Sequence, residues 1–106
     1  MKSIHKYTIS LEGSAIDAPV VKFLDVQMQY GLPRVWAEVD TSLPERHFLI
    51  IPIGTGWDLD EMIHFDIMTY MGTVQESSGT LVWHLYCCEL KEPYEKIKYR
   101  YEKEQD

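Results

Sequence analysis

The stretch that decides the fold reads Tyr70-Met-Gly-Thr-Val-Gln75, then Glu76-Ser-Ser-Gly79, then Thr80-Leu-Val-Trp-His-Leu-Tyr86. Two β-rich runs flank a four-residue turn that ends in glycine, which is typical of a β-hairpin. Side chains in a strand alternate between two faces. The second run therefore has one face of Leu81, Trp83 and Leu85 and another of Val82, His84 and Tyr86. This stretch predicts two antiparallel strands.

Further strands are predicted upstream of the hairpin. Val35, Ala37 and Val39 alternate with polar residues, so 34–40 is the clearest half-buried strand. Residues 47–53 are apolar on both faces, which favours a central or covered strand with Pro52 near an edge or bulge. Residues 4–11 and 20–29 indicate two more strands, with 13–19 as a connecting loop. In the second of these strands the side chains expected to point inward are Leu24, Val26 and Met28.

The composition changes at Glu89. Residues 89–106 contain six acidic and five basic residues, and Tyr94, Ile97 and Tyr101 recur at i, i+3 and i+7. This spacing predicts a short amphipathic helix. We therefore divide the chain into a β-rich domain, 1–88, and a charged helical extension, 89–106. The predicted fold class is mainly β: a curled antiparallel sheet or barrel of five to six strands with a C-terminal helix.

Length and charge exclude several classes of function. The chain has 106 residues, enough for one core, and a net charge of −7 at pH 7. Residues 1–88 contain 11 acidic and 5 basic residues, whereas non-specific nucleic-acid binding requires a basic surface. Residues 1–7 lack the apolar segment of a signal peptide, and no apolar run reaches membrane-spanning length. We expect a cytoplasmic protein without membrane contact.

The sequence contains no catalytic motif. Cys87 and Cys88 are adjacent and lack an obvious base, so we expect them to be buried core residues. His64, Asp66 and His84 are the candidates for acid–base or metal chemistry, and a small hydrolase of nucleotide signals stays an alternative. We expect a protein that is not an enzyme and that uses no cofactor.

Two short motifs are candidate ligand-binding groups. Arg34 and Trp36 lie on the polar face of a predicted strand, where an indole beside a guanidinium can stack on a base and pair with a phosphate. Alternatively, Trp36 covers a second core layer, or packs under the helix or a partner subunit. Gly54, Thr55 and Gly56 follow an apolar strand. Their backbone N–H groups can approach an anion, although a glycine turn between elements is the commoner explanation.

Several motifs together resemble a family of small, uncharacterised phage and prophage proteins. They are His5-Lys-Tyr7, Val35-Trp-Ala-Glu-Val-Asp40, Gly54-Thr-Gly56 and the closing pair Gly72-Thr-Val-Gln75 and Leu81-Val-Trp-His84. The resemblance covers residues 4–87 and brings no catalytic residue. It implies a viral origin and a role in the host cytoplasm during infection.

A host-directed binding protein is the function that these observations favour. The first hypothesis is a homo-oligomer, a dimer or higher, that sequesters a cyclic nucleotide immune signal through Arg34, Trp36, Gly54, Thr55 and Gly56. The alternative is an acidic inhibitor that occupies the basic site of a host nuclease or polymerase. A chain this short, with both faces of 47–53 apolar, cannot easily cover itself, which favours a twofold dimer.

Overall fold

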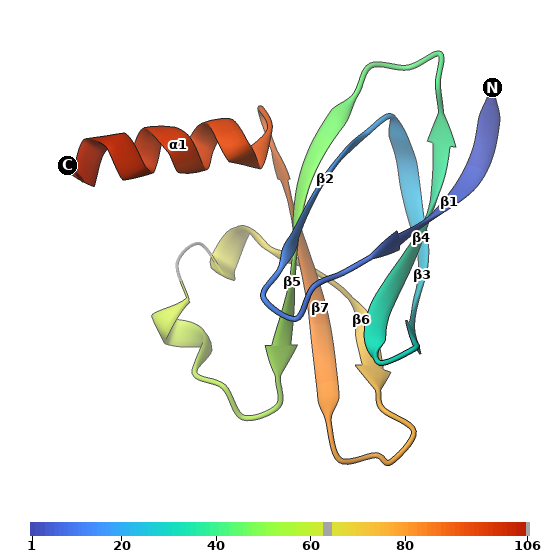
Figure 1. Cartoon of the computed structure of the whole chain (residues 1–106), viewed down its shortest axis with the longest axis vertical. Helices are drawn as coiled ribbons and strands as arrows, with labels where there is room; N and C mark the ends of the chain where they lie inside the picture. The colour runs from blue at the N-terminus through green and yellow to red at the C-terminus, as the bar shows by residue number, and fades with distance from the viewer. Residues whose placement is uncertain (63–64, 106) are drawn as a thin grey trace.

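The computed structural model describes residues 1–62 and 65–105 of the chain. Within these residues antiparallel strands dominate and one α-helix follows them (Figure 1). The strands are β1 (Lys2–Thr8), β2 (Ser14–Ala18), β3 (Val20–Gln29), β4 (Leu32–Asp40), β5 (Arg46–Gly54), β6 (Thr69–Gln75) and β7 (Val82–Leu90). Two 3-10 helices, η1 (Leu59–Glu61) and η2 (Phe65–Ile67), precede β6, and α1 spans Tyr94–Gln105.

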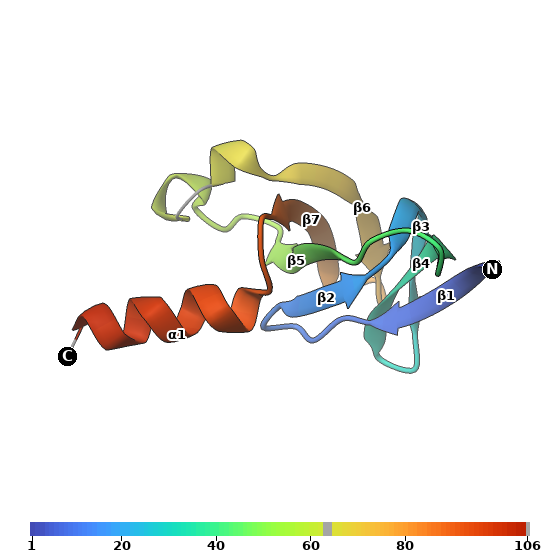
Figure 2. The same cartoon turned by 90° about the horizontal axis from the view of Figure 1, so that it is seen from above.

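The strands form two antiparallel sheets that share one core (Figure 2). One sheet has the order β1-β4-β3 and the other the order β2-β5-β7-β6. Only Pro19 separates β2 from β3, so the chain crosses between the sheets at this residue. The predicted fold class, mainly antiparallel β with a C-terminal helix, is confirmed. The two sheets do not close into a barrel, and the described residues form seven strands where five or six were expected.

Alternating burial explains how the sheets face each other. Val35, Ala37 and Val39 of β4 are at most 1% exposed, and the residues between them are partly exposed, as the period-two pattern predicts. β5 lies between β2 and β7, which agrees with its two apolar faces. The pairing of β2 with β5 runs from Arg46 to Ile50. Pro52 lies beyond this pairing, where β5 is paired only with β7 among the described strands, as the expected position near an edge predicts.

Two local predictions are wrong. Residues 14–18, expected in a loop, form β2, whose Ile16 and Ala18 are buried in the core. The small and polar residues around them weaken the period-two signal. Leu24, expected inward, is 43% exposed because the register between β3 and β4 shifts between Phe23 and Asp25. A β-bulge of this kind turns one residue out of the alternation.

The C-terminal helix is present and projects from the sheets. β7 continues to Leu90, so the first two residues of the predicted extension belong to a strand. α1 lies closest to β5 and extends away from the body of the molecule (Figures 1 and 2). In the described parts of the chain no helix is both long and apolar enough to cross a membrane.

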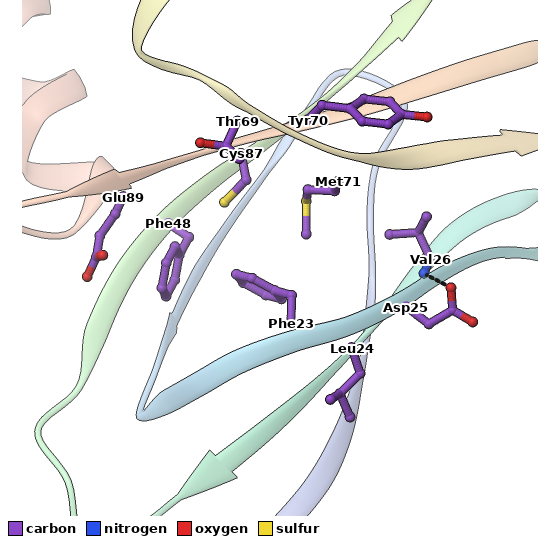
Figure 3. Close-up of a pocket in the computed structure, with 10 residues that line it drawn as sticks. All are labelled: Phe23, Leu24, Asp25, Val26, Phe48, Thr69, Tyr70, Met71, Cys87 and Glu89. Atoms are coloured by element: carbon purple, nitrogen blue, oxygen red, sulfur yellow. Dashed lines mark hydrogen bonds between the residues drawn. The ribbon is translucent and has the colours of Figure 1, made fainter.

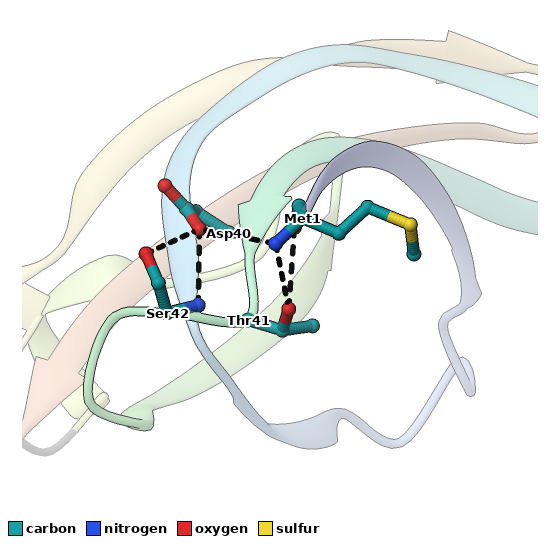
Figure 4. Close-up of polar contacts among 4 residues, drawn as sticks. All are labelled: Met1, Asp40, Thr41 and Ser42. Carbon is teal, nitrogen blue, oxygen red and sulfur yellow. Dashed lines mark hydrogen bonds and ion pairs between the residues drawn. The ribbon is translucent and has the colours of Figure 1, made fainter.

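Polar contacts hold the start of the chain against the end of β4 (Figure 4). Asp40 accepts hydrogen bonds from the Ser42 hydroxyl and backbone N–H, at 2.7 and 3.0 Å. Its Oδ1 lies 3.8 Å from the N-terminal ammonium of Met1, which donates to Thr41 Oγ1 at 3.0 Å. The Ser42 hydrogen bonds hold the pKa of Asp40 below its usual value. These contacts fix the register of β1 on β4.

Candidate functional site

Arg34 and Trp36 lie on the side of the three-stranded sheet that is turned away from the core. Directly opposite residues of an antiparallel pair share a face, and the partners of Trp36 are Lys6 on β1 and Asp25 on β3. We call the outward side chains of β1, β3 and β4 the Trp36 face. α1, η1 and η2 all lie on the side of the other sheet (Figure 2), so no helix in the described residues covers this face.

Four of the five basic residues in 1–88 gather on the Trp36 face. They are Lys2, Lys6, Lys22 and Arg34, each placed by its register partner on β4 or by β4 itself. Among the described residues none of the four forms a salt bridge. Three acidic residues share the face: Asp25, Glu38 and Asp40. The face is thus slightly basic on a chain of net charge −7.

Aromatic rings stand beside two of these cations. Lys6 Nζ lies 6.0 Å from the centroid of the partly buried Trp36 ring. Arg34 Cζ lies 6.0 Å from the ring of Tyr30, which is 92% exposed in the turn between β3 and β4. Arg34 donates from Nε to the Gln29 carbonyl at 3.3 Å and from Nη1 to Thr8 Oγ1. These bonds orient the guanidinium, and within the described residues Nη2 makes no hydrogen bond and can meet a ligand.

Gly54, Thr55 and Gly56 lie in the other sheet, at the end of β5. Gly54 closes a turn in which its carbonyl accepts a hydrogen bond from Trp57 N at 3.2 Å. A Cβ on Gly54 would lie 2.6 Å from Trp57 Nε1, so the glycine is needed for the indole to pack there. The described cavities around this turn, including one of about 260 Å³, contain neither Arg34 nor Trp36 in their walls. The structure therefore does not join the two predicted parts of the site.

His84 belongs to a hydrogen-bonded chain of hydroxyl groups on the outer side of the four-stranded sheet. Its Nε2 lies 2.7 Å from Thr55 Oγ1 and its Nδ1 lies 3.0 Å from Thr73 Oγ1, which is 2.5 Å from the Tyr70 hydroxyl. Asp66 is in η2, and among the described residues it makes no hydrogen bond to this chain of groups. His64, the third residue of the hydrolase hypothesis, lies outside the described residues. The contacts of His84 are with hydroxyls, which suits a structural network.

A cleft that the sequence did not reveal opens between β3 and β6, the neighbouring edge strands of the two sheets. Its volume is about 420 Å³. Phe23, Phe48, Met71 and Cys87 converge in it, and the two phenyl rings meet edge to face at 5.0 Å (Figure 3). Glu89 and Asp25 lie at its two ends (Figure 3). We call it the β3–β6 cleft; its size falls in the range of roughly 300–1,000 Å³ typical of ligand sites.

The floor of the cleft is chemically inert. Cys87 and Cys88 are both buried free thiols, as the sequence predicts. Burial raises the pKa of the Cys87 thiol to about 12, so it is protonated and unreactive at neutral pH. The cleft can therefore bind apolar groups, and its geometry depends on the bulge at Phe23, which no sequence pattern indicates.

The fold and these surfaces define a small two-sheet antiparallel β protein with a projecting helix. Residues 1–96 match the model of a domain family described as a domain of unknown function, DUF7352, and the chain belongs to this family. No curated protein matches the chain significantly. No solved structure matches it either.

Proposed function

We propose that this protein is a non-enzymatic, host-directed binding protein of phage origin that sequesters a cyclic nucleotide immune signal on the Trp36 face. One observation carries the proposal: four of the five basic side chains of residues 1–88 lie on the same outward face as Trp36, and no element of the described structure covers this face. Bases stack on exposed aromatic rings, and arginine pairs with phosphate.

The charge of the rest of the molecule supports a small ligand over a nucleic acid. A net charge of −7 repels a long polyanion, because its phosphates extend beyond any local basic surface. A cyclic nucleotide has few phosphates and can lie within the Trp36 face. Its affinity then comes from stacking on Trp36 and from a hydrogen bond donated by Nη2 of Arg34, and the overall field contributes little.

Calorimetric titration with a cyclic mononucleotide and a cyclic dinucleotide tests the proposal. Stacking contributes about 1–3 kcal/mol per base, so Trp36→Ala should weaken binding roughly tenfold to a hundredfold. The melting temperature should change little, because this indole lies outside the core. Trp57→Ala is the matched control: it removes a tryptophan from the turn after β5, away from the Trp36 face, and should leave the dissociation constant unchanged.

Two results would contradict the proposal. In the first, Trp36→Ala binds at full strength. In the second, the loss of binding follows a large fall in melting temperature, which would make Trp36 a structural residue. Recovery of the ligand after denaturation separates binding from hydrolysis, because a binding protein releases intact ligand and a hydrolase releases product.

A further inference from the structure

An exposed carboxylate, that of Asp25, lies beside Trp36 on the Trp36 face. The register of β3 on β4 pairs Asp25 directly with Trp36, because the shift after Phe23 turns Asp25 outward. Cβ atoms of directly opposite residues in an antiparallel pair lie about 4.5–5.5 Å apart. A base stacked on the indole can therefore bring its edge within reach of this carboxylate.

The Asp25 carboxylate is held in place and can accept two more hydrogen bonds. Its Oδ1 accepts from the Val26 N–H at 2.8 Å (Figure 3), and its Oδ2 accepts from Gln27 Nε2 at 3.1 Å. Each carboxylate oxygen has room for two donors, so one position is left on each. Within the described residues no cation forms a salt bridge with Asp25. The group can thus receive two parallel N–H donors from a ligand.

Two cations of the face gather toward one end of the indole. Lys6 Nζ donates to Gln29 Oε1 at 3.2 Å, and Arg34 Nε donates to the Gln29 carbonyl at 3.3 Å. A nucleotide stacked on Trp36, with its phosphate at these cations, can turn the edge of its base to Asp25. The site therefore has separate groups for the phosphate, the base ring and the base edge.

Guanine is the base whose edge matches this carboxylate. Its Watson–Crick edge presents two adjacent donors, the ring N1–H and the exocyclic N2 amine, and each can bond one carboxylate oxygen. Adenine presents one amine beside an unprotonated ring nitrogen, whose lone pair would face the second oxygen. A stacked guanine therefore uses both open positions of Asp25, whereas adenine uses one and is repelled at the other.

We propose that the Trp36 face selects guanine, with Asp25 as the residue that determines this specificity. The inference rests on the proposed function, because it names the base bound at the same site. Trp36 and the two cations cannot make the choice, since every base has a face that stacks and every nucleotide has a phosphate. The sequestered signal is then a cyclic nucleotide that contains guanine.

Calorimetric titration of the full-length chain with guanine and adenine cyclic nucleotides, as mononucleotides and as dinucleotides, tests the selection. A bidentate contact to a base edge discriminates roughly tenfold to a hundredfold, and the guanine ligands should bind more tightly by this factor. Cyclic inosine monophosphate keeps the N1–H and lacks the N2 amine, so its affinity should fall between those of the two mononucleotides. This series needs no substitution and does not depend on the folding of a variant.

Two substitutions test the role of Asp25. In Asp25→Asn an amide N–H opposes the guanine donors, so the ratio of guanine to adenine affinity should fall to about 1. Glu38→Gln is the matched control, because it removes one negative charge from the same face at a residue that pairs with Lys22. This variant should keep the wild-type ratio. Thermal melts verify that both variants fold.

The outcomes separate this inference from the proposed function. Equal affinities of the wild type for guanine and adenine ligands, or a wild-type ratio that persists in Asp25→Asn, would overturn the guanine selection. Either result would leave a nucleotide site on the Trp36 face. If none of these nucleotides binds the wild type, the proposed function fails and the guanine selection fails with it.

Discussion

At the scale of single residues, one close contact holds the two sheets together where they are not hydrogen-bonded. Gly72 on β6 faces Val26 on β3, and a Cβ on this glycine would lie 2.5 Å from Val26 Cγ2. The glycine thus lets the valine enter the gap between the two edge strands. The contact lies between the β3–β6 cleft, which contains Val26, and a second cavity of about 460 Å³ lined by residues from the far ends of both strands.

Substitution of Gly72 by alanine should therefore be destabilising and suppressible. We expect Gly72→Ala to lower the free energy of unfolding by about 1–3 kcal/mol, the usual cost of overpacking. A second substitution, Val26→Ala, in the same chain should restore part of the lost free energy of unfolding, because it removes the methyl groups that clash with the new Cβ. Urea denaturation of both single variants and the double variant measures the coupling. Additive effects would show that the two residues do not meet.

At the scale of elements, Arg46 joins three strands. It donates to Glu89 on β7 from Nε and Nη2, at 2.8 and 2.7 Å, and to the Val20 carbonyl on β3 at 2.8 Å. Its guanidinium also lies 5.1 Å from the Phe48 ring. The ion pair with Glu89 is partly exposed, so by itself it contributes little to the stability of the fold. The contacts with the Val20 carbonyl and the Phe48 ring are made by Arg46 and do not involve Glu89.

Two substitutions separate these contributions. Arg46→Ala should destabilise the protein more than Glu89→Gln, because only the first removes the contacts with Val20 and Phe48. The hydrogen bonds from Arg46 lower the pKa of Glu89 in the folded protein. The stability that this ionised carboxylate contributes is therefore fully present above its unfolded-state pKa of about 4.3, and it is lost as the pH falls through the lower folded-state pKa. Thermal melts between pH 2 and 7 should show a smaller acid-induced loss in Glu89→Gln. Equal losses in that variant and the wild type would contradict this.

The sequence was sufficient for elements in which one pattern dominates. The alternation in 34–40 located β4 and its inner face, and the spacing of Tyr94 and Ile97 located α1. It was insufficient where tertiary pairing overrides a weak local signal, as in β2, and where the bulge near Phe23 changes which residues point inward. The same holds for the candidate site. The alternation in 34–40 predicts that Arg34 and Trp36 share one face, whereas the lysines of β1 and β3 reach this face only through the pairing of these strands with β4.

At the scale of the whole molecule, charge and packing are divided among separate surfaces. Basic residues of the β-rich part lie around Trp36 on one sheet, and the apolar cleft lies at the gap between the sheets. The other two tryptophans, Trp57 and Trp83, contact each other at the end of the four-stranded sheet, with ring centroids 5.8 Å apart. The Trp36 face and the turn around Gly54 therefore each have a tryptophan of their own, and binding at one can be told from binding at the other.

The indole N–H signals in a two-dimensional ¹H–¹⁵N spectrum, recorded during titration with a cyclic dinucleotide, test the central claim most directly. The chemical shift of an indole N–H changes strongly when its ring stacks on a base, because the ring current of the base acts over only a few ångströms. We predict that the Trp36 signal moves and saturates with the calorimetric dissociation constant, and that the Trp57 and Trp83 signals stay in place. A shift confined to Trp57 and Trp83, or three unmoved signals at millimolar ligand, would contradict a nucleotide site on the Trp36 face.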